Sequence, residues 1–196
     1  MKIMLASRNQ GKIRELSKIL EPLNIELTSQ LDSDIESPDE TGITFVENAL
    51  IKAREVSEKA GLPCIADDSG ICVPALGGAP GIYSARYAGV GASDEQNNEK
   101  LRQKLSKETD THAFYYCVLV FVRNPLDPAP IISVGEWHGS IVQEKKGSNG
   151  FGYDPYFWLQ KYQCTAAELP SHTKNLISHR AKASRKLMEE LIQVGI

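Results

Sequence analysis

The chain has 196 residues, of which 41% are hydrophobic and 24% are charged. This is an ordinary composition for a globular protein, and the length suits one domain or a lobed single domain with a sizeable core. The net charge of −3 argues against a surface built for nucleic acid or an anionic membrane. We find no signal peptide or long apolar span and therefore expect a cytoplasmic location.

The cysteines follow neither a C-x-x-C spacing nor a close Cys/His spacing, so the sequence predicts no zinc site. Three of the four lie in apolar, strand-like runs, and we expect reduced core residues rather than disulfides. They are Cys64, Cys72, Cys117 and Cys164.

An apolar run at residues 3–6 predicts a buried strand, and the polar stretch 7–12 leads into apolar residues at helical spacing. A helix start offers free N–H groups and a positive dipole end, to which Asn9 and Lys12 add donors. The P-loop pattern G-x-x-x-x-G-K is absent. From these residues alone, the segment is either a phosphate site or an ordinary capped helix start.

Residues 28–43 are polar and acidic and predict a loop or a short strand. The helix predicted next, over residues 44–60, opens with a capping box of Thr44 and Glu47. Because the cap explains Glu47, this residue is a weaker candidate for a metal ligand. Asn48 and Lys52 share the other helix face, which looks either at solvent or at a charged ligand.

Residues 66–70 read A-D-D-S-G between two short apolar runs and predict a tight turn between strands. Two adjacent carboxylates, Asp67 and Asp68, repel each other unless a cation offsets the repulsion. A divalent ion such as Mg²⁺ binds a few carboxylate oxygens and keeps room for phosphate oxygens. The alternative is a plain polar turn.

The middle of the chain alternates loops and strands. Residues 76–89 form a long Gly/Pro-rich, aromatic stretch that indicates a functional or interface loop. A second capping box at residues 93–96 opens a helix, and residues 113–122 predict a strand buried on both faces in its second half. Two further strands are predicted at 131–137 and 140–143, joined through His138 and Gly139.

Glycines and aromatic residues at 147–155 indicate a backbone that approaches a ligand closely, or else a hairpin loop packed on its own aromatics. Phe151 could stack on a base, and Asp154 could accept a hydrogen bond from a base or ribose. His179 and Arg180, with Lys174 nearby, form a cationic cluster that suits an anionic or carbonyl-rich ligand.

Taken together, the sequence resembles the XTP/dITP diphosphatases, also called inosine triphosphate pyrophosphatases, over nearly its whole length. Six blocks in order carry the resemblance: S-x-N-x-G-K at 7–12, E-T-G-x-T-F-x-E-N-A at 40–49, A-D-D-S-G at 66–70, L-G-G-A-P-G-I-Y-S-A-R-Y at 76–87, G-F-G-Y-D-P at 150–155 and S-H-R at 178–180. One departure is Arg8, where the family usually has glycine; it requires a backbone without positive φ.

This resemblance implies one pyrophosphatase domain over residues 1–196. The implied fold is α/β, elongated and two-lobed, around a long mixed sheet flanked by helices, with the active site in the cleft between the lobes. It also implies a homodimer and hydrolysis of ITP, dITP and XTP to the monophosphate and pyrophosphate. Mg²⁺ is the implied cofactor, with Glu40 and Asp68 as ligands and Asp67 as a further candidate.

The resemblance also assigns roles to individual residues. Asp68 would be the catalytic base on the attacking water. Lys52 would neutralise phosphate charge. The substrate-binding set is Ser7, Arg8, Asn9, Gln10, Gly11, Lys12, Lys52, Ser69, Phe151, Gly152, Tyr153, Asp154, Lys174, His179 and Arg180. Donors aimed at the 6-oxo group would accept hypoxanthine and xanthine but leave adenine mispaired.

Three other functions fit the sequence less well than pyrophosphate release. An NTPase acting at the γ-phosphate lacks support, because neither a P-loop nor a kinase glycine loop is present. A nucleotide sensor without turnover would not need the paired carboxylates at 67 and 68. A nucleic-acid-binding module is disfavoured by the acidic net charge.

Overall fold

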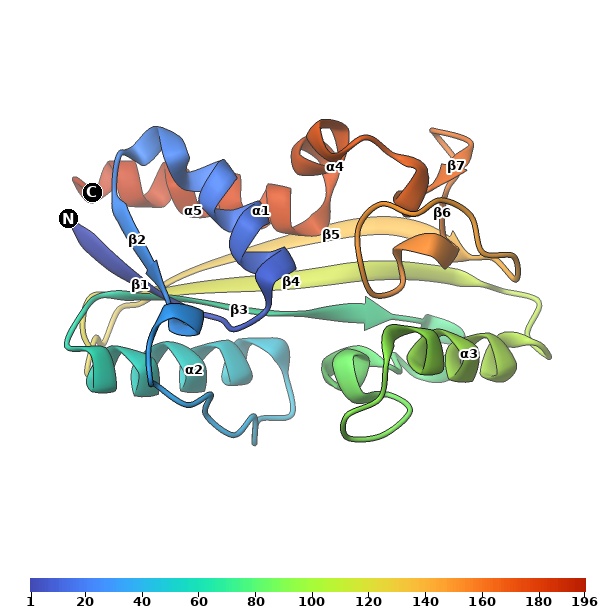
Figure 1. Cartoon of the computed structure of the whole chain (residues 1–196), viewed down its shortest axis with the longest axis horizontal. Helices are drawn as coiled ribbons and strands as arrows, with labels where there is room; N and C mark the ends of the chain where they lie inside the picture. The colour runs from blue at the N-terminus through green and yellow to red at the C-terminus, as the bar shows by residue number, and fades with distance from the viewer. The chain divides into compact units, whose positions relative to one another are not determined.

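The computed structural model describes all 196 residues, which divide into two compact units (Figure 1). Unit 1 comprises residues 1–68, 117–135 and 179–196, and unit 2 comprises residues 69–116 and 136–178. The seven strands follow the order β2-β1-β3-β4-β5-β6-β7. Strand β1 pairs in parallel with β2 and β3, whereas β6 pairs antiparallel with β5 and β7. The predicted mixed sheet flanked by helices is confirmed.

The strands are β1 (Lys2–Ala6), β2 (Glu26–Ser29), β3 (Cys64–Cys72), β4 (His112–Val122), β5 (Ile131–Ile141), β6 (Phe157–Leu159) and β7 (Cys164–Thr165). The α-helices are α1 (Gln10–Leu20), α2 (Phe45–Ala60), α3 (Asp94–Leu105), α4 (Ser171–Ile177) and α5 (His179–Gln193). Short 3₁₀ helices lie between several of them. One, Pro74–Leu76, ends at the start of the predicted loop at 76–89, and another, Gly81–Arg86, lies within this loop. None of the helices combines the length and apolar character needed to cross a bilayer.

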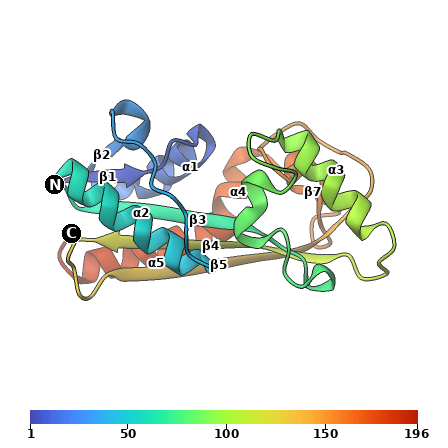
Figure 2. The ribbon, with the colours of Figure 1, turned by 90° about the horizontal axis from the view of Figure 1, so that it is seen from below.

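Unit 1 is a three-layer arrangement (Figures 1 and 2). Helices α1 and α5 pack together over one face of its strands, and α2 covers the opposite face. The hydrophobic core on the α1/α5 side is formed by Ile3, Leu5, Leu16, Leu20, Ile65, Cys117, Leu119, Phe121, Ile131, Ala183, Leu187 and Leu191. Burial of these side chains holds the helices on the sheet, because each of the larger ones stabilises the fold by roughly 1.5–3 kcal/mol.

Helix α2 begins where the sequence predicts, whereas α1 begins at Gln10, inside the polar stretch 7–12 that was expected to precede it. Asn9 caps α1 by accepting a hydrogen bond from the Lys12 amide at 3.1 Å. The predicted capping box of α2 is present, with Thr44 and Glu47 each satisfying the backbone of the other. Gly61, at φ 64°, ends α2 in the left-handed conformation that glycine adopts without steric cost.

Unit 2 has its own aromatic core. Tyr115, Trp137 and Phe157 contact one another, with 4.7 Å between the ring centroids of Tyr115 and Phe157. Helix α3 adds Leu101 and Leu105 to this cluster. The predicted capping box of α3, between Ser93 and Gln96, is present. All four cysteines are free and three are buried, as predicted.

Two sequence predictions about strands are wrong. The A-D-D-S-G stretch is not a turn but the middle of the nine-residue strand β3. Its turn-forming residue types are overridden by tertiary contacts. A Cβ on Gly70 would lie 2.3 Å from the Gly81 carbonyl oxygen, so glycine serves here for close packing.

The second error concerns β5, which runs without a break through the predicted junction at His138 and Gly139. A Cβ on Gly139 would lie 2.5 Å from the carbonyl oxygen of Trp158 on β6. This glycine therefore permits close approach of the neighbouring strand rather than a turn.

Candidate active site

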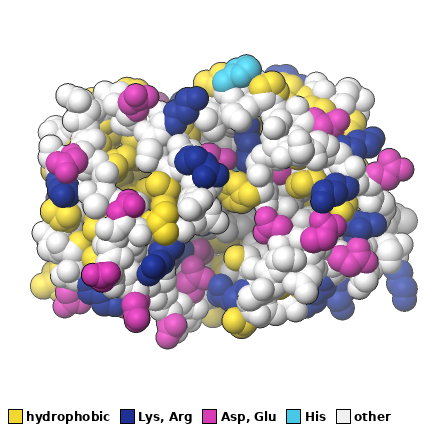
Figure 3. Space-filling view, in the orientation of Figure 1, with side chains coloured by type: hydrophobic (Ala, Val, Ile, Leu, Met, Phe, Trp, Pro, Cys, Tyr) yellow, Lys and Arg dark blue, Asp and Glu magenta, His cyan; other side chains and the backbone are white.

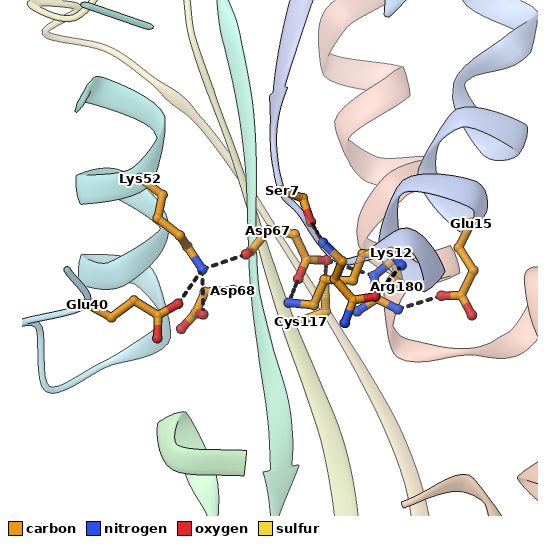
Figure 4. A network of polar contacts seen from close by, with 10 residues as sticks. Ser7, Lys12, Glu15, Glu40, Lys52, Asp67, Asp68, Cys117 and Arg180 are labelled. Carbon is orange, nitrogen blue, oxygen red and sulfur yellow. Dashed lines mark hydrogen bonds and ion pairs between the residues drawn. The ribbon is translucent and has the colours of Figure 1, made fainter. Parts of the chain in front are cut away.

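Two acidic residues adjacent on β3 point to opposite faces of the strand, because successive side chains of a β-strand alternate. Asp68 faces α2, and Asp67 faces α1 and α5 (Figure 4). Both are almost fully buried, with 2% of Asp67 and 5% of Asp68 exposed. Burial therefore does not distinguish them, and their different partners must do so.

On the α2 face, the Lys52 ammonium lies between two carboxylates. Its Nζ donates to Asp68 Oδ1 at 2.8 Å, to Glu40 Oε1 at 2.9 Å and to the Asp67 carbonyl oxygen at 2.8 Å. Lys52 lies on α2, and Glu40 lies in the segment that leads into this helix. Of the two sequence readings of the Lys52 face, solvent is wrong, since Lys52 and Asn48 are buried.

The electrostatics of this group favour a reactive carboxylate. Burial raises the pKa of the Asp68 carboxyl, and the Lys52 ammonium opposes this without cancelling it. Burial acts to lower the pKa of Lys52, but Asp68 and Glu40 outweigh it, so the pKa is raised and the lysine stays charged. The second Asp68 oxygen, Oδ2, is buried and has no hydrogen-bond partner. It is an acceptor held next to a fixed positive charge.

On the α1/α5 face, Asp67 is surrounded by donors. Arg180 Nε donates to Asp67 Oδ2 at 2.8 Å, the Cys117 thiol donates to the same oxygen at 3.3 Å, and Lys12 Nζ bonds to Oδ1. Arg180 also pairs through Nη1 with Glu15 of α1. Burial alone would raise the pKa of Asp67, but Arg180 and Lys12 outweigh it and hold the pKa well below the usual range.

The segment before α1 is folded as a capped helix start. Ser7 Oγ accepts a hydrogen bond from the Asn9 amide at 3.2 Å, while the Asn9 side chain caps the helix. Arg8 is not among the residues with positive φ, as its presence in place of glycine requires. Gln10 and Gly11 are the first two residues of α1. Phosphate binding at this segment stays a prediction.

A third polar cluster lies in unit 2 around Asp154. Its carboxylate accepts from Lys174 Nζ at 2.6 Å, from Tyr115 Oη at 3.1 Å and from the Phe151 amide at 3.0 Å. The Lys174 ammonium also lies 4.9 Å from the centroid of the Phe151 ring, a cation–π contact. The Tyr153 hydroxyl donates to the Ser84 carbonyl oxygen at 2.8 Å.

Comparison with known proteins shows the family of this chain. The model of the Ham1 family matches residues 3–190. The chain belongs to the Ham1 family. The dITP/XTP pyrophosphatase of Nitrosomonas europaea is 52% identical over 190 residues, which are 97% of this chain and 94% of that protein. The dITP/XTP pyrophosphatase of Haemophilus influenzae is 52% identical over 192 residues, covering 97% of this chain and 98% of that protein.

Solved structures of Ham1 proteins share the fold. The HAM1 protein of Coxiella burnetii aligns with a TM-score of 0.92 at 44% identity, over 98% of this chain and 99% of that chain. The Ham1 protein of Staphylococcus aureus aligns with a TM-score of 0.86 at 43% identity, over 99% of this chain and 100% of that chain.

In this Ham1 chain, the predicted site residues fall into separate groups. Glu40 and Asp68, the predicted metal ligands, both bind the Lys52 ammonium, a contact that the sequence analysis does not predict. Phe151, Asp154 and Lys174 also meet, in unit 2. The remaining predicted residues are distributed over the chain: Ser69 follows Asp68 on β3, Gly152 and Tyr153 follow Phe151, and His179 and Arg180 open α5 in unit 1.

The family resemblance places Arg180 among the substrate-binding residues. In the structure its guanidinium is bound by Asp67 and Glu15 instead, and only 1% of the residue is exposed. Substrate binding by Arg180 stays a prediction, whereas its buried ion pairs with Asp67 and Glu15 are present in the structure.

The residues Glu40 and Asp68 fit a divalent cation. They are hard oxygen donors held on the same ammonium, and Asp68 Oδ2 has an unused lone pair. No group of three or more His, Cys, Asp or Glu side chains suited to a metal occurs in the structure. Mg²⁺ commonly binds through one or two carboxylates and takes its other ligands from water and phosphate.

Sequence reasoning missed several partners of these groups. Glu15 follows Lys12 by three residues on α1, a spacing that places both on one side of a helix, but nothing in the sequence connects it to Arg180. Cys117 and Tyr115 lie in an apolar run, where no local signal marks a contact with a distant aspartate.

Proposed function

We propose that this chain hydrolyses non-standard purine nucleoside triphosphates, namely ITP, dITP and XTP, to the nucleoside monophosphate and pyrophosphate, and so removes them from the nucleotide pool. Two relatives with 52% identity over nearly the whole chain are dITP/XTP pyrophosphatases. One structural observation carries the proposal: Asp68 has a buried, unpartnered carboxylate oxygen beside Lys52 and Glu40.

The chemistry begins with water attacking the α-phosphorus. Asp68 accepts a proton from this water, a new P–O bond forms at the α-phosphorus, and the bond to the α–β bridging oxygen breaks with release of pyrophosphate. The raised pKa of the Asp68 carboxyl makes it a stronger base than an exposed aspartate. Lys52, held charged by its two carboxylate partners, offsets negative charge on the phosphates.

We propose Mg²⁺ as the cofactor, with Glu40 and Asp68 as its protein ligands. Held by Glu40 and Asp68, Mg²⁺ would supply positive charge to offset the negative charge that develops on the phosphate oxygens. Both carboxylates bind the Lys52 ammonium, and Asp68 Oδ2 has no hydrogen-bond partner, so a buried acceptor oxygen is available to a cation.

The nucleotide is bound at its two ends by different groups. Residues 7–12, Lys52 and Ser69 bind the phosphates, aided by the positive end of α1. Phe151 stacks on the purine, while Gly152, Tyr153, Asp154, Lys174, His179 and Arg180 shape and read its edge. The contact between Lys174 and the Phe151 ring supports this role, since it places a donor next to the stacking surface. Donors to O6 disfavour adenine, whose amine would face them.

The deciding experiment is a product assay with ITP and Mg²⁺, run beside ATP and GTP. We expect IMP and pyrophosphate from ITP and little product from ATP or GTP. EDTA should stop the reaction and added Mg²⁺ should restore it. Orthophosphate with IDP would overturn the assignment of the bond that is cleaved, and absence of product would favour a nucleotide sensor. Turnover that survives EDTA would exclude the metal scheme.

The family resemblance further supports a homodimer that works in the cytoplasm on a small-molecule nucleotide, without nucleic acid or membrane partners. Light scattering of the purified chain tests the oligomeric state: a molar mass near twice the 21.6 kDa of one chain is expected, and a mass of one chain would contradict it.

A further inference from the structure

The glycine-flanked loop that carries Phe151 is bound from outside by the first turns of α3. The Gly152 amide donates to Asp94 Oδ2 at 2.7 Å. The Gly152 carbonyl oxygen accepts from Asn98 Nδ2 at 2.9 Å. Both polar groups of this one residue are therefore held by side chains one helical turn apart on α3. Such a two-point clamp fixes the position and the orientation of the peptide that follows Phe151.

The clamp itself is rigidly built. Asn98 is buried, with 2% exposed, and its Nδ2 also donates to the Asp94 carbonyl oxygen at 2.8 Å. The capping box of Ser93 and Gln96 fixes the start of the same helix. The clamping side chains thus come from a helix whose own geometry is set by hydrogen bonds.

On the other side of Phe151, the chain is anchored through its own amide. Phe151 N–H donates to Asp154 Oδ2, and Asp154 is held in turn by Tyr115 and Lys174. The loop needs such anchors, because Gly150 and Gly152 both have positive φ, at 78° and 63°, and glycine is free to leave these conformations. Phe151 is the residue between the two anchored points.

We propose that Asp94 and Asn98 are positioning residues for the purine base, acting through Gly152 to hold the Phe151 ring in the orientation for stacking. This inference rests on the proposed function, from which the stacking role of Phe151 comes. Neither residue belongs to the sequence blocks that carry the family resemblance. Their effect falls on binding of the base and not on the proton transfer assigned to Asp68.

The test separates these two effects. Asn98→Asp keeps the shape of the side chain but removes both N–H donors. We expect the KM for ITP to rise about tenfold while kcat stays within about twofold, since binding in the ground state and the transition state is weakened alike. The margin between ITP and ATP should narrow as well, which a purely structural defect would not cause.

Asn97→Asp is the matched control. Asn97 is the neighbour of Asn98 on α3, is equally buried and also bonds to loop backbone, accepting from Ala88 N at 2.7 Å and donating to Ala85 O at 3.2 Å. It introduces the same charge and removes the same type of donor, but leaves Gly152 clamped. An equal rise of KM in this control would reduce the effect to general loosening and overturn the proposal.

A second pair of variants covers the case in which Asn98→Asp does not fold. Asp94 is exposed, and Asp94→Ala removes its bond to the Gly152 amide and should raise KM in the same way. Asp94→Asn keeps an acceptor oxygen and should restore the wild-type KM. Unchanged KM in Asp94→Ala would refute the positioning role.

Affinity for IMP, measured by calorimetry, makes this test independent of turnover. We expect Kd for IMP to rise in Asn98→Asp and Asp94→Ala and to stay unchanged in Asn97→Asp. A wild-type protein that binds IMP but releases no pyrophosphate from ITP would refute the hydrolysis proposal, while the IMP affinities would still decide the role of the clamp. Affinities for IMP that are equal in all variants and in the wild type would refute the positioning role of Asp94 and Asn98.

Discussion

Asp67 and Asp68 are the same residue type, adjacent on one strand and equally buried, yet they are held in opposite ways. On one face of β3, Asp67 is bound by Arg180, Lys12 and Cys117, and its pKa lies well below the usual range. On the other face, Asp68 shares Lys52 with Glu40, and its pKa is raised. The two faces of one strand thus hold one carboxyl with a lowered pKa and one with a raised pKa.

The partners of the two carboxylates explain this difference. Asp67 is bound by two cations, Lys12 and Arg180, whose charges outweigh the effect of burial on its pKa. Asp68 shares Lys52 with Glu40, the effect of burial on its pKa prevails, and its oxygen Oδ2 is buried without a hydrogen-bond partner. A buried carboxylate with an open oxygen can accept a cation or a proton more readily than one that is bound by two cations.

The largest effect is expected for Asp68→Asn. It keeps the shape of the side chain but cannot accept the proton of the attacking water, so kcat for ITP should fall by about 10³-fold. Pyrophosphate release measures this directly. The circular dichroism spectrum should stay unchanged and the thermal midpoint of unfolding should not decrease, because the variant removes a carboxylate that is costly to bury. Turnover near that of wild type would remove the base assignment.

Asp67→Asn is the matched substitution on the opposite face, and we expect it to act mainly on stability. It leaves the buried guanidinium of Arg180 without its main counter-charge, and breaking a buried ion pair costs about 3 kcal/mol or more. Urea denaturation of both variants measures the contrast. A loss of stability in Asp68→Asn as large as that in Asp67→Asn would end the distinction between the two faces.

Much of this contrast was beyond the sequence. Helical periodicity and capping boxes predict α1, α2 and α3 correctly, because these signals are local. Resemblance to a family assigns Glu40 and Asp68 to one metal site, and in the structure both carboxylates bind the same ammonium. The pattern A-D-D-S-G predicts a turn, and this prediction is wrong, since Asp, Ser and Gly favour turns unless contacts with distant residues hold them in a strand. The partners of Asp67 come from α1, β4 and α5, and such long-range contacts leave no mark on local spacing.

A smaller effect is expected for Glu15→Gln, which sharpens the picture of the Asp67 face. The glutamine can still accept from Arg180, and Asp67 remains to balance the guanidinium, so the free energy of unfolding should fall by only about 1 kcal/mol. Equilibrium urea denaturation provides the measurement. A loss as large as that of Asp67→Asn would show that Glu15, and not Asp67, is the main partner of Arg180.

The smallest expected effect is an opposite dependence of stability on pH, measured on metal-free protein. The folded pKa of Asp67 lies below its unfolded value near 3.8, so its contribution is present above that pH and is lost as pH falls towards the folded pKa. The folded pKa of Asp68 is raised, so ionisation of this carboxyl lowers stability as pH rises from about 3.8 through the folded pKa. The stability gap between wild type and Asp67→Asn should therefore shrink in acid. The stability of Asp68→Asn should increase relative to that of the wild type as pH rises from about 3.8 towards neutrality. Urea midpoints at a series of pH values test both trends, and parallel curves for all three proteins would contradict the different ionisation of the two neighbours.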